Sequence, residues 1–149
     1  MERKKHALQA SGALLLLVLC ALPVTAGDKP PVRLYPGAPR AQEEVAVLEI
    51  KRHGLVRANR VVIARIEGAD GLVCNNCGLP DRRMEILPGT YGLTIQYVLM
   101  VKYAEPVTIN VTLEAGHTYT IDGHVQVHWR RDTWRPVIVD TTANRTIVK

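Results

Sequence analysis

Apolar and polar side chains alternate at every second residue along several stretches of the chain, and this is the period of a β-strand. The longest such stretch predicts a strand over residues 90–101, with one face formed by Tyr91, Leu93, Ile95, Tyr97, Leu99 and Val101. The Pro88-Gly89 pair directly before it interrupts the pattern and predicts a turn. The longest predicted strand and the clearest predicted turn are therefore adjacent in the sequence.

The same reasoning predicts strands in most of the remaining chain. β-Branched runs favour strands at 45–50 and 61–66, and alternation favours strands at 84–87, 107–113, 119–130 and 134–139. The run at 45–50 is apolar almost throughout, as in a central strand buried on both faces, although residues 43–51 also fit a helical pattern. Ala115-Gly116 predicts a tight hairpin between two of these strands. Because no segment carries a useful helical stripe, we expect an all-β fold, an antiparallel β-sandwich of about seven strands.

The first 26 residues have the three parts of a secretory signal peptide. A basic start is followed by an apolar run from Ala13 to Leu22 and by small residues that end at Ala26, after which we expect cleavage. The run is shorter than the roughly 20 apolar residues that span a bilayer, so we expect no transmembrane segment in the mature protein. The alternatives are an uncleaved anchor and a lipoprotein signal with Cys20 as the lipidated residue, although the bulky Leu19 precedes it. The leader is of the bacterial type, which predicts a periplasmic or secreted protein.

The mature chain divides into an arm and a domain. Residues 27–44 contain four prolines, which favour an extended backbone and exclude a helix. In this arm, Leu34 and Tyr35 either pack on the domain or belong to a spacer. Residues 45–149 form the predicted β-sandwich domain, and a hydrophobic content of 47% suits one globular core. The formal net charge of +5 is scattered and partly located in the leader, so it does not favour nucleic-acid binding.

Three turn-and-strand motifs carry a resemblance to a known group of proteins. They are Leu87-Pro88-Gly89-Thr90-Tyr91-x-Leu93, Leu113-x-Ala115-Gly116-His117-Thr118-Tyr119 and Trp134-x-Pro136-x-Ile138-x-Asp140, preceded by Arg33-Leu34-Tyr35-Pro36-Gly37. With them the chain resembles small exported bacterial envelope proteins, often lipoproteins, that have a PEGA-like or transthyretin-like β-sandwich. The resemblance covers most of residues 33–140 and implies a fold and a location. It implies no catalytic residue and no cofactor.

Cys74-Asn75-Asn76-Cys77 is the most suggestive local motif, and it is not part of that resemblance. In an oxidising compartment Cys74 and Cys77 are expected to form a disulfide that fastens a loop between two strands. A redox-active pair is an alternative, but such cysteines usually lie at a helix N-terminus, and glycines and a proline flank this motif. A metal site is a further alternative that would need a second pair of ligands.

Aromatic and basic side chains gather near the end of the chain, in a possible interaction patch formed by Trp129, Arg130, Arg131, Trp134 and Arg135. Tryptophan and arginine are favoured at recognition surfaces, so an exposed patch would suit a protein partner or an acidic envelope component. The alternation of Trp129 with Val125 and Val127 equally favours a tryptophan in the core.

The histidines give little indication of chemistry. His124 and His128 lie on one face of a strand but ~13 Å apart, which is too far to share a metal ion. His117 follows a turn glycine and is expected to hydrogen-bond locally. The sequence lacks a nucleophile elbow, a zinc-protease motif and a phosphate-binding glycine loop. We therefore expect a non-enzymatic envelope accessory or interaction module without cofactor or metal, with a thiol-redox or metal-handling protein and a carbohydrate-binding module as alternatives.

Overall fold

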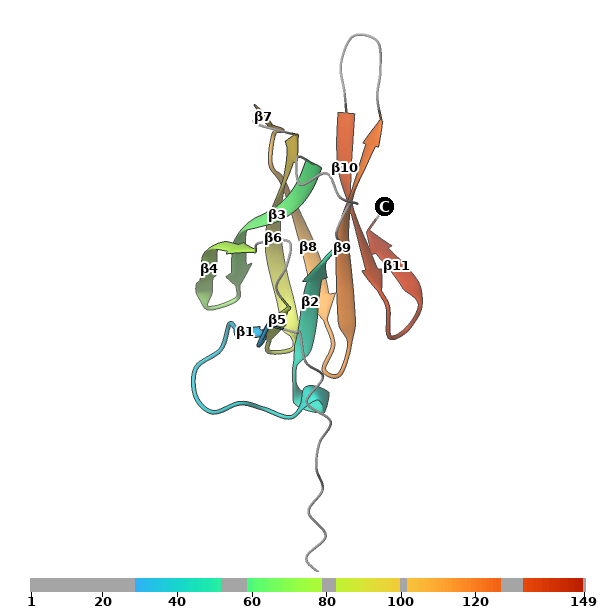
Figure 1. The fold of residues 1–149 in the computed structure, drawn as a ribbon. Helices are drawn as coiled ribbons and strands as arrows, with labels where there is room; N and C mark the ends of the chain where they lie inside the picture. Colours follow the sequence, from blue (N-terminus) through green and yellow to red (C-terminus); the bar gives the residue numbers. More distant parts are fainter. Residues whose placement is uncertain (1–28, 52–58, 79–82, 100–101, 127–132, 149) are drawn as a thin grey trace, which may run out of the picture.

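The computed structural model describes residues 29–51, 59–78, 83–99, 102–126 and 133–148, which form two β-sheets packed face to face (Figure 1). The predicted all-β sandwich is therefore confirmed. The described residues contain eleven strands, more than the seven or so predicted. None of the helices in the described ranges is long and apolar enough to cross a membrane. The predicted signal peptide, including Cys20 and Ala26, lies outside the described residues.

The first sheet has six strands. In spatial order they are β1 (Val32–Arg33), β5 (Met84–Ile86), β2 (Ala46–Ile50), β9 (Thr118–Gln126), β10 (Thr133–Asp140) and β11 (Arg145–Val148). The second sheet has five strands, with β4 (Gly71–Gly78), β3 (Asn59–Gly68) and β6 (Gly89–Leu99) in order, while β7 (Lys102–Tyr103) and β8 (Val107–Leu113) both pair with β6.

The first sheet is mixed, so the predicted antiparallel pairing holds for most of the described strand pairs but is wrong for two of them. Strand β1 runs parallel to β5, and β2 runs parallel to β9. The physical reason is that the chain changes sheet after β2, β4, β5 and β8, so consecutive strands are often not neighbours. A strand that returns to a sheet after such an excursion can enter it in either direction.

The hairpin predicted at Ala115-Gly116 is also wrong, because β8 and β9 belong to different sheets. The turn between them crosses from one layer to the other. Gly116 adopts φ +77°, which favours glycine, and its N–H donates a hydrogen bond of 2.8 Å to the carbonyl of Val45. The Glu114 N–H donates to the Tyr119 hydroxyl at 2.8 Å. These contacts dock the turn against the start of β2 and replace a hairpin ladder.

The core lies between the sheets and contains side chains from both. Strand β2 is buried along most of its length and lies inside the first sheet, as its apolar run predicted. A short 3-10 helix (Gln42–Glu44) precedes it, so the ambiguous segment at 43–51 is mainly a strand. The largest fully buried side chains come from both layers: Tyr119, Leu48, Ile63, Ile66, Met84, Ile86, Leu93, Ile95, Leu113, Ile121, Ile138 and Val45.

The proline-rich arm packs on the domain in its described part, which decides between the two interpretations left open for Leu34 and Tyr35. Strand β1 pairs with β5, and Leu34 packs against the core. Tyr35 is buried, and its hydroxyl donates a hydrogen bond of 3.0 Å to the Glu85 carboxylate. The arm thereby forms part of the surface beside the β5–β6 connection.

Candidate functional site

A cleft of about 410 Å³ lies where three segments distant in sequence meet. The segments are the arm after β1, the β3–β4 turn with the start of β4, and the connection from β5 into β6. The residues that line the cleft are Leu34–Pro36, residues 68–73 and residues 87–91. The Pro88-Gly89 turn that dominates the sequence pattern therefore forms one wall of this cleft.

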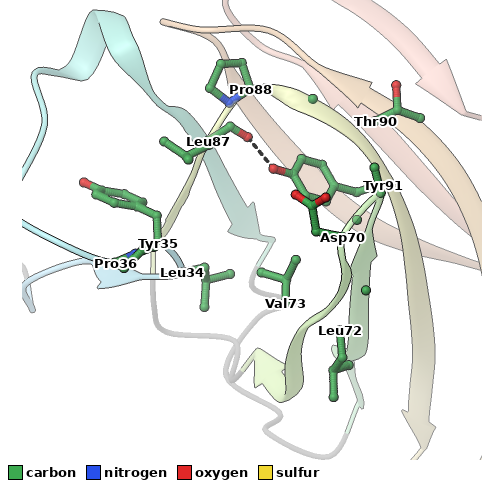
Figure 2. Close-up of a pocket in the computed structure, with 14 residues that line it drawn as sticks. Leu34, Tyr35, Pro36, Asp70, Leu72, Val73, Leu87, Pro88, Thr90 and Tyr91 are labelled. Carbon is green, nitrogen blue, oxygen red and sulfur yellow. Dashed lines mark hydrogen bonds between the residues drawn. The ribbon is translucent and has the colours of Figure 1, made fainter.

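Apolar side chains form the middle of the cleft (Figure 2). Leu34, Val73 and Leu87 lie between the rings of Tyr35 and Tyr91, which occupy opposite sides. The pairing of β3 with β4 shifts register at Val73, since Ile66 pairs with Cys74 and Glu67 with Leu72. Such a β-bulge changes the direction of side chains, and Val73 points into the cleft here. The strand irregularity is thus part of how the cleft is lined.

Tyr91 is held in place by two contacts. Its hydroxyl donates a hydrogen bond of 2.8 Å to the Leu87 carbonyl, across the β5–β6 turn. Its ring lies against Gly68, where a Cβ atom would be 3.1 Å from the ring. Burial, followed by the nearby Asp70 carboxylate, raises the pKa of Tyr91, so the phenol stays protonated and keeps donating. The wall of the cleft that Tyr91 forms is therefore fixed.

Asp70 is the charged side chain of this cleft. It lies in the β3–β4 turn, is exposed, and points toward the ring of Tyr91 in Figure 2. No other residue that lines the cleft carries a carboxylate, an ammonium or a guanidinium group. Within the described part of the chain, its carboxylate forms neither an ion pair nor a hydrogen bond. Leu72, near the start of β4, is an apolar side chain that is 56% exposed.

The predicted cysteine pair is found at disulfide distance, but in a different setting from the one expected. Cys74 and Cys77 have Cα atoms 5.6 Å apart and lie within strand β4, whereas the sequence predicted a loop. Their strand is at the edge of its sheet, and between Asn75 and Gly78 two residues of β4 lie opposite the single Ala64 of β3. Asn76, between them, adopts φ +55°, which asparagine tolerates better than most residues. The disulfide therefore spans a second bulge in β4.

The surroundings of this pair favour a structural role. Both cysteines are half-buried and pack against the core, and neither begins a helix. A helix N-terminus is the usual device that lowers a cysteine pKa in redox-active pairs. In the ranges that the structure describes, no group of three histidine, cysteine, aspartate or glutamate side chains is arranged to hold a metal ion.

We expect the double substitution Cys74→Ser and Cys77→Ser to lower the free energy of unfolding by about 2 kcal/mol, because the disulfide closes a very short loop. Urea denaturation of the oxidised wild type and of the variant measures this difference. The same wild type after reduction by a dithiol serves as a control and should match the variant. A loss well above this value would mean that the pair does more than restrict the unfolded chain.

The aromatic–basic patch predicted near the end of the chain does not form one surface in the described residues. Trp134 and Arg135 are successive residues of β10, so they point to opposite faces. Trp134 turns inward, stacks on Tyr97 with ring centroids 5.9 Å apart, and donates its indole N–H to the Glu105 carbonyl at 3.1 Å. Arg135 is exposed on the outer face, paired across the strands with His124. Trp129, Arg130, Arg131 and His128 lie outside the described residues.

Asp140 is a buried acidic residue at the end of β10 that the sequence did not single out as a site residue. Asp140 is 0% exposed. Its carboxylate lies 2.8 Å from His117 Nδ1, and it accepts hydrogen bonds from the Ala143 N–H at 2.9 Å and from Arg145 Nε at 3.3 Å. Burial alone would raise the pKa of Asp140, but these three donors hold it below its ordinary value. The signal in the sequence was its period-two spacing from Pro136 and Ile138, which places Asp140 on the core face.

His117 and Asp140 lie as close together as an acid–base pair, but the contacts around them indicate a structural role. The cluster formed by Glu114, His117, Asp140 and Arg145 is called the clasp below. In the described part of the chain, the second ring nitrogen of His117, Nε2, faces the Glu114 carboxylate at 3.8 Å rather than a hydroxyl or thiol nucleophile. Arg145 contacts both Glu114 and Asp140. These groups connect the β10–β11 turn to the crossing turn between β8 and β9. We therefore interpret the clasp as a tie between the two sheets.

Comparison of the chain with protein-family models, with curated proteins and with solved structures finds no match. The function is therefore inferred from the residues and geometry of this chain.

Proposed function

We propose that this chain is a non-enzymatic, exported β-sandwich protein that binds an envelope partner through the cleft lined by Leu34, Val73, Leu87 and Tyr91. The observation that carries the proposal is the cleft itself, a hollow of about 410 Å³ with an apolar middle and a few placed polar groups at its edge. Binding sites in proteins usually have this composition and a volume of several hundred Å³.

The rigidity of the cleft supports a binding role. Its walls are turns anchored in the two sheets, and the hydrogen bond from Tyr91 to Leu87 fixes one of the two tyrosines that line it. The arm contributes through Tyr35, which Glu85 holds in place. A site that exists before its ligand arrives spends less free energy on ordering loops, so a small contact area suffices for measurable affinity.

Export is supported by the sequence and is compatible with the cysteine pair. The predicted three-part leader at residues 1–26 favours it, and so does the resemblance of the turn motifs to those of exported envelope proteins. Disulfides persist mainly in oxidising compartments, and Cys74 and Cys77 are at disulfide distance.

The alternative functions have less support. A carbohydrate-binding face would need solvent-exposed indoles, and Trp134, the tryptophan that the structure describes, is partly buried and stacked on Tyr97. A thiol-redox protein would need an activated cysteine, and this pair lies inside a β-strand.

The test is a substitution that fills the cleft without touching the core. Ala69 is exposed and lines the cleft, so Ala69→Trp should obstruct it, whereas Ala143→Trp adds the same bulk to an exposed turn elsewhere. Linear peptides selected from a displayed library on the purified wild-type chain are titrated against both variants. We expect Ala69→Trp to weaken binding by at least about tenfold and Ala143→Trp to leave it unchanged. Equal binding by all three proteins, or a library without enriched peptides, would contradict the proposal.

A further inference from the structure

We infer that the occupant of the cleft is a protein segment that presents an apolar side chain next to a lysine or arginine. The inference rests on the proposed function, since it names the chemistry of the partner for the same cleft. It follows from three features of the described residues, which are the lone carboxylate at the rim, the apolar middle, and the irregular free edge of β4.

The carboxylate sets the charge of the partner. Asp70 is exposed at the rim of the cleft, and its charge is balanced by no cation within the parts of the chain that the structure describes. The protein as a whole carries a formal charge of +5, so a negative rim is a local departure from the average surface. Charge complementarity steers encounter and suppresses wrong partners. A cationic group beside the bound side chain is therefore favoured, and an acidic segment is disfavoured.

The apolar side chains in the middle of the cleft indicate which kind of side chain the partner presents next to its cation. Leu34, Val73 and Leu87 offer only hydrocarbon to a ligand, and the Tyr91 ring closes one side. Tyr91 has its hydroxyl engaged with a backbone carbonyl, so its ring contributes mainly contact area. Leu72 extends this apolar surface beyond the rim, with 56% of its surface exposed. An aliphatic or aromatic side chain that enters between Tyr91 and Leu34 would bury this surface, while a cation next to it reaches Asp70.

The irregular free edge of β4 indicates that such a segment is held by its side chains rather than by strand addition. Strand β4 pairs with β3 on one side, and no described strand pairs with its other side. An edge of this kind usually invites strand addition, but bulges disturb the regular row of backbone groups. Strand β4 carries two register shifts against β3. Recognition therefore depends on side chains in the cleft, and a short sequence motif with an apolar and a basic residue suffices.

The test uses the peptides selected on the wild-type chain and two charge variants. Asp70→Asn keeps the shape of the side chain and removes its charge, and Asp70→Lys reverses the charge. Glu105→Gln, at an exposed acid on the connection before β8, is the matched control. We expect selected peptides to share an apolar residue next to lysine or arginine. We expect Asp70→Asn to weaken them about threefold, Asp70→Lys about tenfold, and Glu105→Gln to leave them unchanged.

The outcomes separate this inference from the proposed function. Peptides that are blocked by Ala69→Trp but lack basic residues, and that bind Asp70→Lys as well as wild type, would overturn the inference and leave the binding role intact. Peptides that are insensitive to Ala69→Trp would overturn both. If free lysine amide bound as tightly as the peptides, the inference would also be overturned, because the inference requires the apolar contact to contribute as much to binding as the charge does.

Discussion

Replacing Asp140 by alanine is expected to lower the free energy of unfolding by about 3 kcal/mol, since removing one partner of a buried ionic cluster leaves the others unpaired. Asp140 is fully buried, and it accepts from Ala143 and Arg145 while it contacts His117. Alanine removes the acceptor for all three. Urea denaturation of the wild type and of Asp140→Ala measures the loss.

Asp140→Asn is the matched control for shape. The amide oxygen can still accept the Ala143 N–H, but the charge that faces His117 and Arg145 is gone. We expect a loss smaller than that of Asp140→Ala. Equal stability of Asp140→Ala and the wild type would mean that the clasp does not hold the sheets together.

The pH dependence of this difference has a definite sign. The folded protein holds the pKa of Asp140 below its ordinary value, because the hydrogen bonds from Ala143, His117 and Arg145 outweigh burial. The unfolded chain has an ordinary pKa of about 4, so it binds a proton on acidification before the folded chain does. The stabilisation is therefore complete above that pKa and is lost as the pH falls through the lower folded value. The stability gap between wild type and Asp140→Asn should shrink on acidification, and a gap that grows would contradict this assignment.

Sequence periodicity predicted those strands that have one buried face and regular pairing. Strand β8 has the predicted bounds 107–113, and β6 and β10 differ only at their ends. Strand β4 was missed because its glycines, asparagines and cysteines carry no alternating pattern, and its two bulges break the period. Strands β1, β7 and β11 have only two to four residues, which is too short for a periodic signal.

Which strands pair could not be predicted in the same way. Ala115-Gly116 has the composition of a hairpin turn, but contacts with Val45 and Tyr119 determine that it crosses between sheets. The cleft combines three segments, and the sequence singled out Leu34 and Tyr35 of the arm and the Pro88-Gly89 turn, but not their meeting with the β3–β4 turn. The role of Asp70 depends on the position of Tyr91 and Leu34 around it, which no local pattern contains. Local sequence patterns thus predicted individual strands and turns, whereas the cleft is formed by segments that are distant in the sequence.

Gly123→Ala is the second substitution with a large expected effect. Gly123 lies buried in β9, at a place where β9 and the opposite sheet approach closely. A Cβ atom there would be 2.7 Å from Val61 Cγ2 and 2.8 Å from Tyr97 Cδ2. Tyr97 has little room to retreat, because it stacks on Trp134. We expect Gly123→Ala to lower the free energy of unfolding by about 2 kcal/mol, the typical cost of overpacking a core.

A matched glycine in the same fold separates packing from backbone effects. Gly92 lies in β6, and a Cβ atom there would have its nearest neighbour at 3.5 Å, an ordinary contact. Neither glycine adopts a positive φ, so alanine is compatible with both backbones. Gly92→Ala should therefore be neutral or stabilise by up to about 1 kcal/mol, through the smaller entropy of the unfolded chain. Thermal or urea denaturation of the two variants, side by side, gives the comparison.

A second substitution tests whether the clash with Val61 is the cause. Val61→Ala removes the methyl group closest to the new Cβ atom, so it should cost less in the Gly123→Ala background than in the wild type. The sum of the losses in free energy of unfolding of the two single variants would then exceed the loss of the double variant. Strictly additive losses would show that the strain at Gly123 is carried by Tyr97 and its stacking on Trp134, and the matching test is then Tyr97→Leu in the same background. Either result identifies the contact that sets the spacing of the two sheets.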